Sequence, residues 1–268
     1  MPNKEDRYVI PSVVRALQIL EAFSSEKTTY TNAEISRTLG LNKSSVTRLL
    51  YSLEKAGFIK RNIETGSYQL THKSLQIGRV YISQVNFHKV AMPVLQELTA
   101  SCQETSHLGV LEEMEVLYLD WVASNQTVAL ASLTGKKLPA YCTGVGKNFL
   151  AHMDEETLSS YLHNIHLAQY TSKTITDPEK LKEHLKLVKK HGYAIDDGEF
   201  QEDVISVSSP IFDDNGSILA GISVAGPAFR MRNTFLVKNI IPKVRRAGTE
   251  ISRRLGWDGV GGDLYIAT

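Results

Sequence analysis

Apolar residues recur at helical spacing three times within the first 57 residues of the chain. The first run follows Ser12, a residue type that often caps helix N-termini, so we expect a helix to begin there. Its apolar positions are Val13, Val14, Leu17, Ile19, Leu20 and Phe23. This run would supply the first helix of a small three-helix core.

The second and third runs are short, closely spaced and bounded by helix start and stop signals. Thr31 with Glu34 three residues later forms a capping-box pattern, and Asn42 can cap the next helix. Gly40 and Gly57 can adopt the left-handed backbone that ends a helix. The inward-facing residues would be Ala33, Ile35 and Leu39, then Val46, Leu49, Leu50 and Leu53. Two helices joined by a turn with glycine are typical of a helix-turn-helix.

A short β-hairpin is predicted after the third helix. Residues 58–70 indicate two strands joined by a tight turn at Thr65-Gly66, where glycine supplies a positive φ. Three helices followed by such a hairpin make a winged helix-turn-helix, which we place at residues 8–70. Residues 71–87 mix apolar and polar positions at helical spacing, so we expect a linker helix there.

The rest of the chain reads as a second, larger domain over residues 88–256, beginning with a helix at Ala91. Asp213-Asp214-Asn215-Gly216 is a turn signal between two β-rich runs, which predicts a hairpin. The order of elements favours an α+β fold with an antiparallel sheet flanked by helices, and a C-terminal tail at 257–268. The predicted strands are 105–111, 115–122, 128–133, 206–213 and 217–225, and the predicted helices are 146–153, 155–165, 178–191 and 238–255.

Length and composition agree with two globular domains. The chain has 268 residues, of which 42% are hydrophobic, enough for two packed cores. We expect no membrane span because no segment approaches 18 uninterrupted apolar residues. The charged first residues do not resemble a signal peptide, and the two cysteines cannot form a disulfide framework. A cytoplasmic protein is therefore expected.

Positive charge is concentrated on residues 41–61, which span the third predicted helix and the start of the wing. The whole chain carries a net charge of only +1, whereas residues 41–61 carry five basic residues against Glu54 alone, a net charge of +4. A solvated helical hairpin would share the helix pattern, but the wing and this local charge favour a polyanion as partner. The expected contacts with double-stranded DNA are Lys43, Ser44, Ser45, Thr47, Arg48 and Tyr51, with Arg61 of the wing on phosphate.

Three further blocks carry a family resemblance. They are residues 135–151 (Gly-Lys-Lys-Leu-Pro through Gly146-Lys147), residues 192–200 (Gly-Tyr-Ala-Ile-Asp-Asp-Gly-Glu-Phe), and residues 206–213 with 220–227 and Arg230. Together with the winged helix-turn-helix, these blocks resemble the IclR family of bacterial transcriptional regulators over about residues 8–256. The resemblance implies a GAF-like effector-binding domain that holds a small effector, often an organic acid.

Candidate effector contacts follow from this resemblance and from one loop. Thr143-Gly144-Val145 precedes a predicted helix whose free N–H groups favour an anion, although a plain turn into a helix would look the same. The resemblance implies effector contacts at Thr143, Gly144, Val145, Asp196, Val204, Ser206 and Ser223. Ser206 replaces a cysteine found in many members, and Ala225 replaces a possible serine, so the effector can differ from the family's keto acids.

Other chemistry is weakly indicated. Asp196, Asp197, Glu199, Glu202 and Asp203 form an acidic cluster, in which we interpret Glu202 and Asp203 as solvated. His163 and His166 are three residues apart on a predicted helix, but no further ligand completes a metal site, so neither metal nor cofactor is expected.

The sequence thus predicts a ligand-responsive regulator that binds a palindromic operator as a homodimer or homotetramer. The alternative is an enzyme acting on a small organic acid, with an appended winged-helix module. The glycine-rich loop and the carboxylates keep that alternative open, although no arrangement of nucleophile and base is visible.

Overall fold

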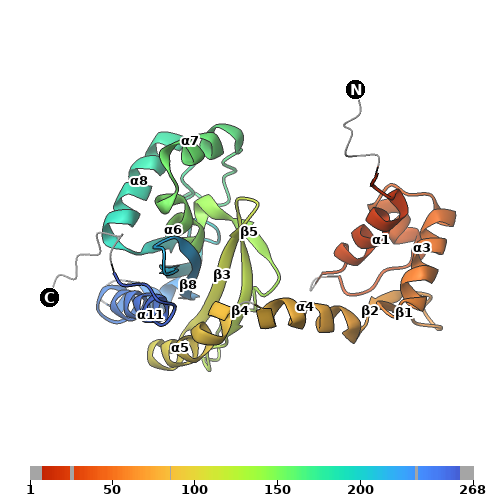
Figure 1. The fold of residues 1–268 in the computed structure, drawn as a ribbon, viewed down its shortest axis with the longest axis horizontal. Helices are drawn as coiled ribbons and strands as arrows, with labels where there is room; N and C mark the ends of the chain where they lie inside the picture. Colours follow the sequence, from red (N-terminus) through yellow and green to blue (C-terminus); the bar gives the residue numbers. More distant parts are fainter. Residues whose placement is uncertain (1–7, 25–26, 85, 233–234, 260–268) are drawn as a thin grey trace. The chain divides into compact units, whose positions relative to one another are not determined.

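The computed structural model describes residues 8–24, 27–84, 86–232 and 235–259. The chain divides into two compact units, Met1–Gln84 and Val85–Thr268 (Figure 1). The helix that we expected as a linker is α4 (His72–Gln84), and it belongs to the first unit.

The first unit is a winged helix-turn-helix, as predicted. Its core consists of residues at the expected apolar positions, and Ile19, Ile35, Val46 and Leu50 are completely buried. The two wing strands pair antiparallel, with Lys60 opposite Gln69. The elements before α4 are α1 (Pro11–Glu21), α2 (Asn32–Thr38), α3 (Lys43–Lys55), β1 (Ile59–Arg61) and β2 (Tyr68–Leu70).

Most of the predicted start and stop signals of these helices are confirmed. Thr31 and Glu34 form a complete capping box, and the Asn42 side chain accepts a hydrogen bond from the Ser45 N–H at 2.8 Å. Gly40 and Gly57 have φ of +62° and +80°. The prediction for Ser12 was wrong, because α1 begins at Pro11, whose fixed φ and missing N–H suit the first helical position.

The second unit is built on a six-stranded antiparallel sheet with the order β5-β4-β3-β8-β7-β6. Its strands are β3 (Thr105–Glu112), β4 (Glu115–Val122), β5 (Lys137–Pro139), β6 (Ala194–Asp197), β7 (Val204–Phe212) and β8 (Ile218–Pro227). Its helices are α5 (Asn86–Cys102), the 3-10 turn η2 (Ala140–Cys142), α6 (Gly144–His152), α7 (Glu155–Asn164), α8 (Pro178–His191), α9 (Ala228–Met231), the π-helical segment η3 (Leu236–Ile240) and α11 (Ile241–Arg254).

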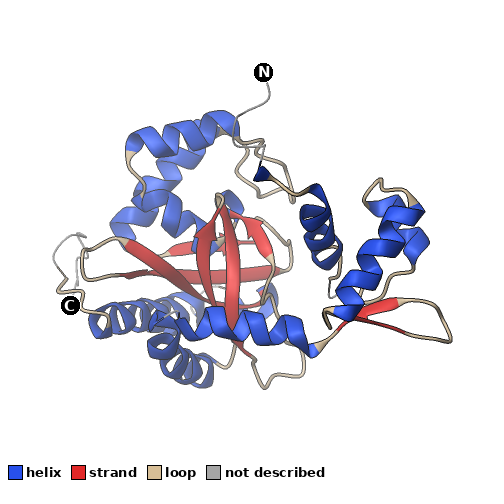
Figure 2. Ribbon diagram, turned by 45° about the vertical axis from the view of Figure 1, so that its right-hand side comes forward, coloured by secondary structure: helices blue, strands red, loops and turns tan. Residues whose placement is uncertain are grey.

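Helices cover both faces of this sheet (Figure 2). Leu108, Val207, Ile222 and Val224 face α5 and α11 and form the main apolar core. Helix α6 packs on the opposite face, over two glycines that are paired across β3 and β8, Gly109 and Gly221. A Cβ atom on Gly221 would lie 2.9 Å from Cγ1 of Val145, so the absence of side chains here lets α6 approach the sheet.

Several predicted boundaries of this unit were wrong. The predicted strand 128–133 is a loop, and the edge strand is instead β5, a few residues later. The loop is held by Arg230, whose guanidinium donates to the Val128 carbonyl at 2.7 Å and pairs with the buried Glu104 at 2.6 and 2.9 Å. Its residues 130–133 line a cavity, as described below, and such a short apolar run is also what a buried strand shows.

Other elements were missed or misplaced. Strand β6 was not predicted because it is short and ends in two aspartates, which strands disfavour. Helix α5 begins at Asn86 rather than Ala91, and the predicted helix 238–255 begins as the π-helical segment η3. Trp257, the first residue of the predicted tail, is buried against Phe212 with ring centroids 5.1 Å apart. The remaining tail residues 260–268 lie outside the described residues.

Candidate functional site

The predicted DNA-contacting side chains lie mainly on the exposed side of α3. Lys43, Ser44, Thr47 and Arg48 are exposed, and 61% of Tyr51 is accessible to solvent. Ser45 is half-buried. The outer face therefore offers two long cations and one aromatic hydroxyl, which suit contacts with phosphates and base edges.

Two of the predicted hydroxyl groups hold the helix-turn-helix together. The Ser44 hydroxyl donates to the Asn42 side chain at 2.9 Å. Thr47 Oγ1 donates to the Lys43 carbonyl and accepts from Asn32 Nδ2, both at 2.8 Å. The contact from Asn32 joins α2 to α3 and was not foreseen. These hydroxyls therefore fix the start of α3 and its contact with α2, whereas the side chains of Lys43 and Arg48 are exposed.

Arg61 is the last residue of β1, next to the turn of the wing. Its guanidinium is 5.9 Å from the centre of the Tyr68 ring, and its backbone N–H donates to Glu54 of α3 at 3.1 Å. The wing is thereby tied to the recognition helix, with the arginine side chain exposed.

The second unit contains a cavity of about 180 Å³ on the face of the sheet that α6 covers. Five predicted effector residues line it, namely Thr143, Asp196, Val204, Ser206 and Ser223. Residues that sequence reasoning missed complete the lining, and they are His107, Tyr118, Leu130, Ala131, Ser132, Leu133, Lys136, Leu138, Phe200, Gln201 and Ala225. The loop after β4 supplies one wall through residues 130–136.

Gly144 and Val145 were predicted to contact the effector, but they are absent from the cavity lining. A Cβ atom on Gly144 would lie 2.8 Å from Ser208 Oγ and 3.2 Å from Ser206 Oγ. Val145 is completely buried above the glycine pair of β3 and β8. Both residues therefore pack α6 against the sheet and contribute to the cavity only indirectly.

Strand register explains why the polar residues converge. Directly opposed residues of antiparallel strands point to the same face. His107 is paired with Ser223, Ser206 with Ala225, and Asp196 with Ser206. The floor thus receives side chains from two neighbouring rows of the sheet, with His107 and Ser223 in one and Ala225, Ser206 and Asp196 in the next. The signal in the sequence was the alternation from Thr105 through His107 to Gly109, which needed the pairing of β3 with β8 to acquire meaning.

Asp196 is the buried carboxyl group of the cavity. It is 6% exposed, and its Oδ1 accepts the Glu199 N–H at 2.6 Å. Burial raises the pKa of Asp196 to about 6, an effect that the nearby Lys147 ammonium partly offsets. Two other members of the predicted acidic cluster, Glu202 and Asp203, are exposed as expected.

A buried ion pair lies behind this wall. The Lys147 ammonium, which is completely buried in α6, pairs with Glu199 and donates to the Ile195 carbonyl. His184 Nε2 lies 3.4 Å from the same ammonium. Burial, together with that positive charge, lowers the pKa of His184 to about 4. The ion pair anchors the turn that carries Phe200 and Gln201 to the cavity.

Replacing Asp196 with asparagine should stabilise the protein at pH 8 and have little effect near pH 4. The folded-state pKa of about 6 lies above the ordinary value of 3.8, so the folded state binds more protons between these values. The carboxyl therefore favours folding below its ordinary pKa, and this contribution is lost as the pH rises through about 6. The amide stays neutral throughout.

Urea unfolding of both proteins between pH 4 and pH 8 measures this difference in stability. Asp197→Asn, at an exposed carboxylate of the same strand, is the matched control for the amide substitution. A stability difference between Asp196→Asn and the unmodified protein that is the same at both ends of the pH range would contradict the assignment.

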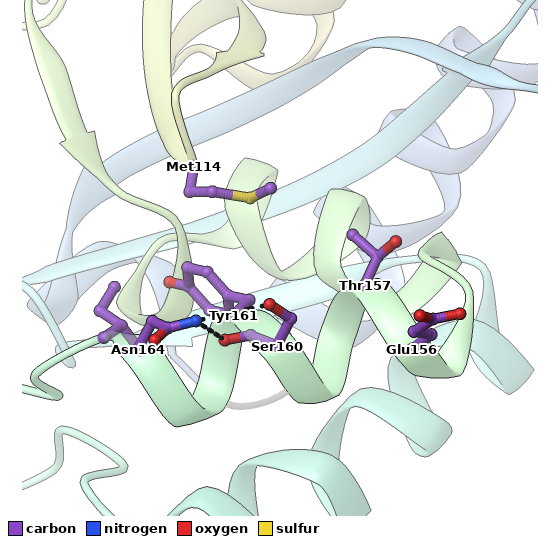
Figure 3. A pocket seen from close by; sticks show the side chains of 7 residues that line it. Met114, Glu156, Thr157, Ser160, Tyr161 and Asn164 are labelled. Atoms are coloured by element: carbon purple, nitrogen blue, oxygen red, sulfur yellow. Dashed lines mark hydrogen bonds between the residues drawn. The ribbon is translucent and has the colours of Figure 1, made fainter. Parts of the chain in front are cut away.

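A second hollow, of about 570 Å³, is an open groove beside α7 (Figure 3). Met114 lies on one side of it, and Glu156, Thr157, Ser160 and Tyr161 lie along the helix. Asn164 also lines the groove, and its side-chain amide donates within α7 to the Ser160 carbonyl at 2.8 Å. None of the predicted effector residues lines this groove.

The part of the chain that the structure describes contains no candidate membrane span and no candidate metal site. No helix there has the length and apolar character to cross a bilayer. No group of three or more His, Cys, Asp or Glu side chains there is arranged to hold a metal ion. Helix α7 ends at Asn164. The prediction that His163 and His166 lie on one helix was therefore wrong, because His166 follows the helix.

Comparison with known proteins identifies both units. Residues 12–62 match the IclR helix-turn-helix domain, and residues 79–253 match the bacterial transcriptional regulator IclR C-terminal domain. The HTH-type transcriptional regulator XynR of Escherichia coli is 30% identical over 249 residues, covering 93% of this chain and 98% of that protein.

Solved structures show the same fold. The crystal structure of IclR from Thermotoga maritima superimposes with a TM-score of 0.77 at 29% identity, covering 92% of this chain and 99% of that one. An IclR homolog of Microbacterium hydrocarbonoxydans complexed with 4-hydroxybenzoate gives a TM-score of 0.81 at 24% identity, covering 91% and 98%. The chain therefore belongs to the IclR family of bacterial transcriptional regulators, which bind DNA and carry a separate effector-binding domain.

Proposed function

We propose that this protein binds operator DNA through α3 and the wing, and that a small organic acid in the cavity of the second unit changes that binding. The observation that carries the proposal is the cavity itself, because three strands and the start of α6 each contribute predicted effector residues to its lining. Lys43, Arg48 and Tyr51 would contact bases and phosphates, and Arg61 would contact the backbone beside the wing.

The cavity supports a compact effector. Its volume of about 180 Å³ is close to that of cavities of about 150 Å³ that hold one benzene ring. The hydroxyls of Thr143, Ser206 and Ser223 offer hydrogen bonds, and apolar side chains of the loop 130–133 cover the ring or chain. A carboxylic acid with a single ring or a short chain fits this lining. 4-Hydroxybenzoate, which a protein of the same fold binds, is a suitable first probe.

A symmetric assembly would match a palindromic operator. Helix α1 carries exposed apolar residues at helical spacing, with Val13, Val14 and Leu17 each 42–52% accessible. We propose that a second copy of the chain covers this stripe, in a homodimer or a homotetramer. Two recognition helices would then read two half-sites in the cytoplasm, where the chromosome lies.

The proposal assigns no enzymatic activity to the second unit. Burial raises the pKa of the Cys142 thiol to about 12, so it would not supply a thiolate nucleophile at neutral pH. The effector acts instead by binding the two DNA-affinity states unequally.

A mobility-shift assay on the double-stranded DNA upstream of the protein's own gene tests this function. We expect a specific complex whose affinity changes when 4-hydroxybenzoate or another member of a panel of small carboxylic acids is added. A parallel turnover assay with the same acids should show no product. A protein that converts the acids without retarding DNA would instead support an enzyme.

Ser206→Val should abolish the response to the effector and leave DNA affinity unchanged. The substitution removes a hydroxyl from the cavity wall and puts a larger, apolar side chain in its place. The measurement is the operator dissociation constant with and without the acid. Ser217→Val, at an exposed residue before β8, is the control and should respond normally. A normal response of Ser206→Val would move the effector site elsewhere.

A further inference from the structure

His107 occupies the middle of the cavity floor without a hydrogen-bond partner. It lies on β3, one of the two central strands of the sheet, and is 1% exposed. Both ring nitrogens are buried, and neither hydrogen bonds to any of the described residues. Buried polar groups are nearly always paired, so an unpaired imidazole in a cavity wall indicates a partner that binds there.

The surroundings of His107 hold its ring in place and keep it neutral. The Trp121 ring stacks on it with centroids 6.4 Å apart, and the Tyr118 ring contacts it edge-on at 5.6 Å. Its cross-strand partner is Ser223. Burial lowers the pKa of His107 to about 4, so at neutral pH the ring carries one N–H donor and one acceptor nitrogen.

Charged groups give the cavity two unlike ends. Asp196 lies on β6, at one edge of the sheet, and Lys136 immediately precedes β5 at the other edge. A carboxylate ligand is repelled by the Asp196 side and attracted by the Lys136 side. His107 and Tyr118, on β3 and β4, lie between the centre and the Lys136 side.

We propose that His107 determines effector specificity by donating its ring N–H to the effector carboxylate, with the opposite end of the effector directed toward Asp196. This inference rests on the proposed function and names the residue that recognises the acid. Asp196 would then accept a hydrogen bond from a donor such as a hydroxyl at the far end of the ligand. The favoured class is a compact hydroxy acid whose two groups lie at opposite ends.

A ligand-binding role for the unpaired His107 ring predicts an effect on protein stability that a purely structural histidine would not show. An orphaned polar side chain costs stability in the free protein, and the cost is recovered only when the ligand binds. Replacing it with an apolar ring of similar shape should therefore spare or raise stability without ligand while removing ligand binding.

Thermal unfolding of the full chain with and without 4-hydroxybenzoate, and with the carboxylic acid panel, tests the proposal. His107→Phe keeps a planar ring and should melt at the same or a higher temperature without acid, with acid binding at least tenfold weaker. His107→Gln retains an N–H donor and should bind within a few-fold of the unmodified protein. His152→Gln, at a histidine that is bonded to the Asn148 carbonyl outside the cavity, should shift normally.

Each result decides the matter. Unchanged acid binding in His107→Phe would overturn the role of His107 and leave the proposed function standing. Lower ligand-free melting temperatures in both His107 variants would also overturn it, because they would show that the ring stabilises the fold. No shift of the unmodified protein with any acid would overturn the proposed effector class, and this inference with it.

Discussion

Replacing Lys147 with methionine should lower the free energy of unfolding by about 3–5 kcal/mol, because it leaves the Glu199 carboxylate buried without its counter-charge. Methionine fills a similar volume, so packing changes contribute little. The Ile195 carbonyl also loses its ammonium donor. Urea unfolding at pH 7 measures the loss, and binding to the cavity should weaken in parallel because the turn with Phe200 and Gln201 loses its anchor.

Two controls separate this effect from a general lysine-to-methionine effect. Lys137→Met removes a lysine whose partners, Glu112 and Glu113, are exposed, and such surface pairs contribute less than about 1 kcal/mol. The double variant Lys147→Met with Glu199→Gln removes both charges and should recover most of the stability lost by the single variant. A single variant as stable as Lys137→Met would show that the buried pair contributes nothing.

Arg48→Ala should weaken operator binding by about 1–3 kcal/mol, which corresponds to about 5- to 150-fold, if this guanidinium reads a guanine in the major groove. Arg48 is exposed on α3. The loss should be specific, so the ratio of operator affinity to random-DNA affinity should fall. A mobility shift or fluorescence titration on both DNAs, at one fixed salt concentration, gives this ratio.

The matched control is Arg37→Ala on α2, where the side chain is exposed and donates to the Ala33 carbonyl of its own helix. Both variants lose one positive charge from the same unit. Arg37→Ala should therefore show the purely electrostatic share of the effect, with an unchanged affinity ratio. If Arg48→Ala equals this control, Arg48 contacts phosphate only and does not read sequence.

Local rules explain what sequence reasoning predicted well. The capping box of Thr31 and Glu34 and the cap at Asn42 depend on residues three apart, so they are readable without the fold. Strand β6 and the loop 128–133 depend on which strands pair, and a short stretch of sequence does not reveal that pairing. A short apolar run looks the same for a buried strand and for a loop that folds over a cavity.

The cavity residues also divide into those that the sequence predicted and those that it did not. Ser206 and Asp196 were found through the family resemblance, whereas His107 was not, because burial without a partner is a property of the assembled sheet. The burial of Lys147 was not predicted either. Lysine is ordinarily a surface residue, and only its pairing with Glu199 permits burial.

The glycine pair beneath Val145, which lets α6 approach the sheet, consists of other residues than those that would select the ligand. A side chain at Gly221 would displace Val145 and the helix that carries it. His107 and Ser223 form the next cross-strand pair on the same face of the sheet, and Asp196 lies in the row beyond it, opposite Ser206. Substitutions at His107 or Asp196 would change what the cavity recognises, whereas substitutions at the glycines would change where the helix lies. Such a domain can evolve, or be engineered, to recognise new metabolites while it keeps one stable architecture.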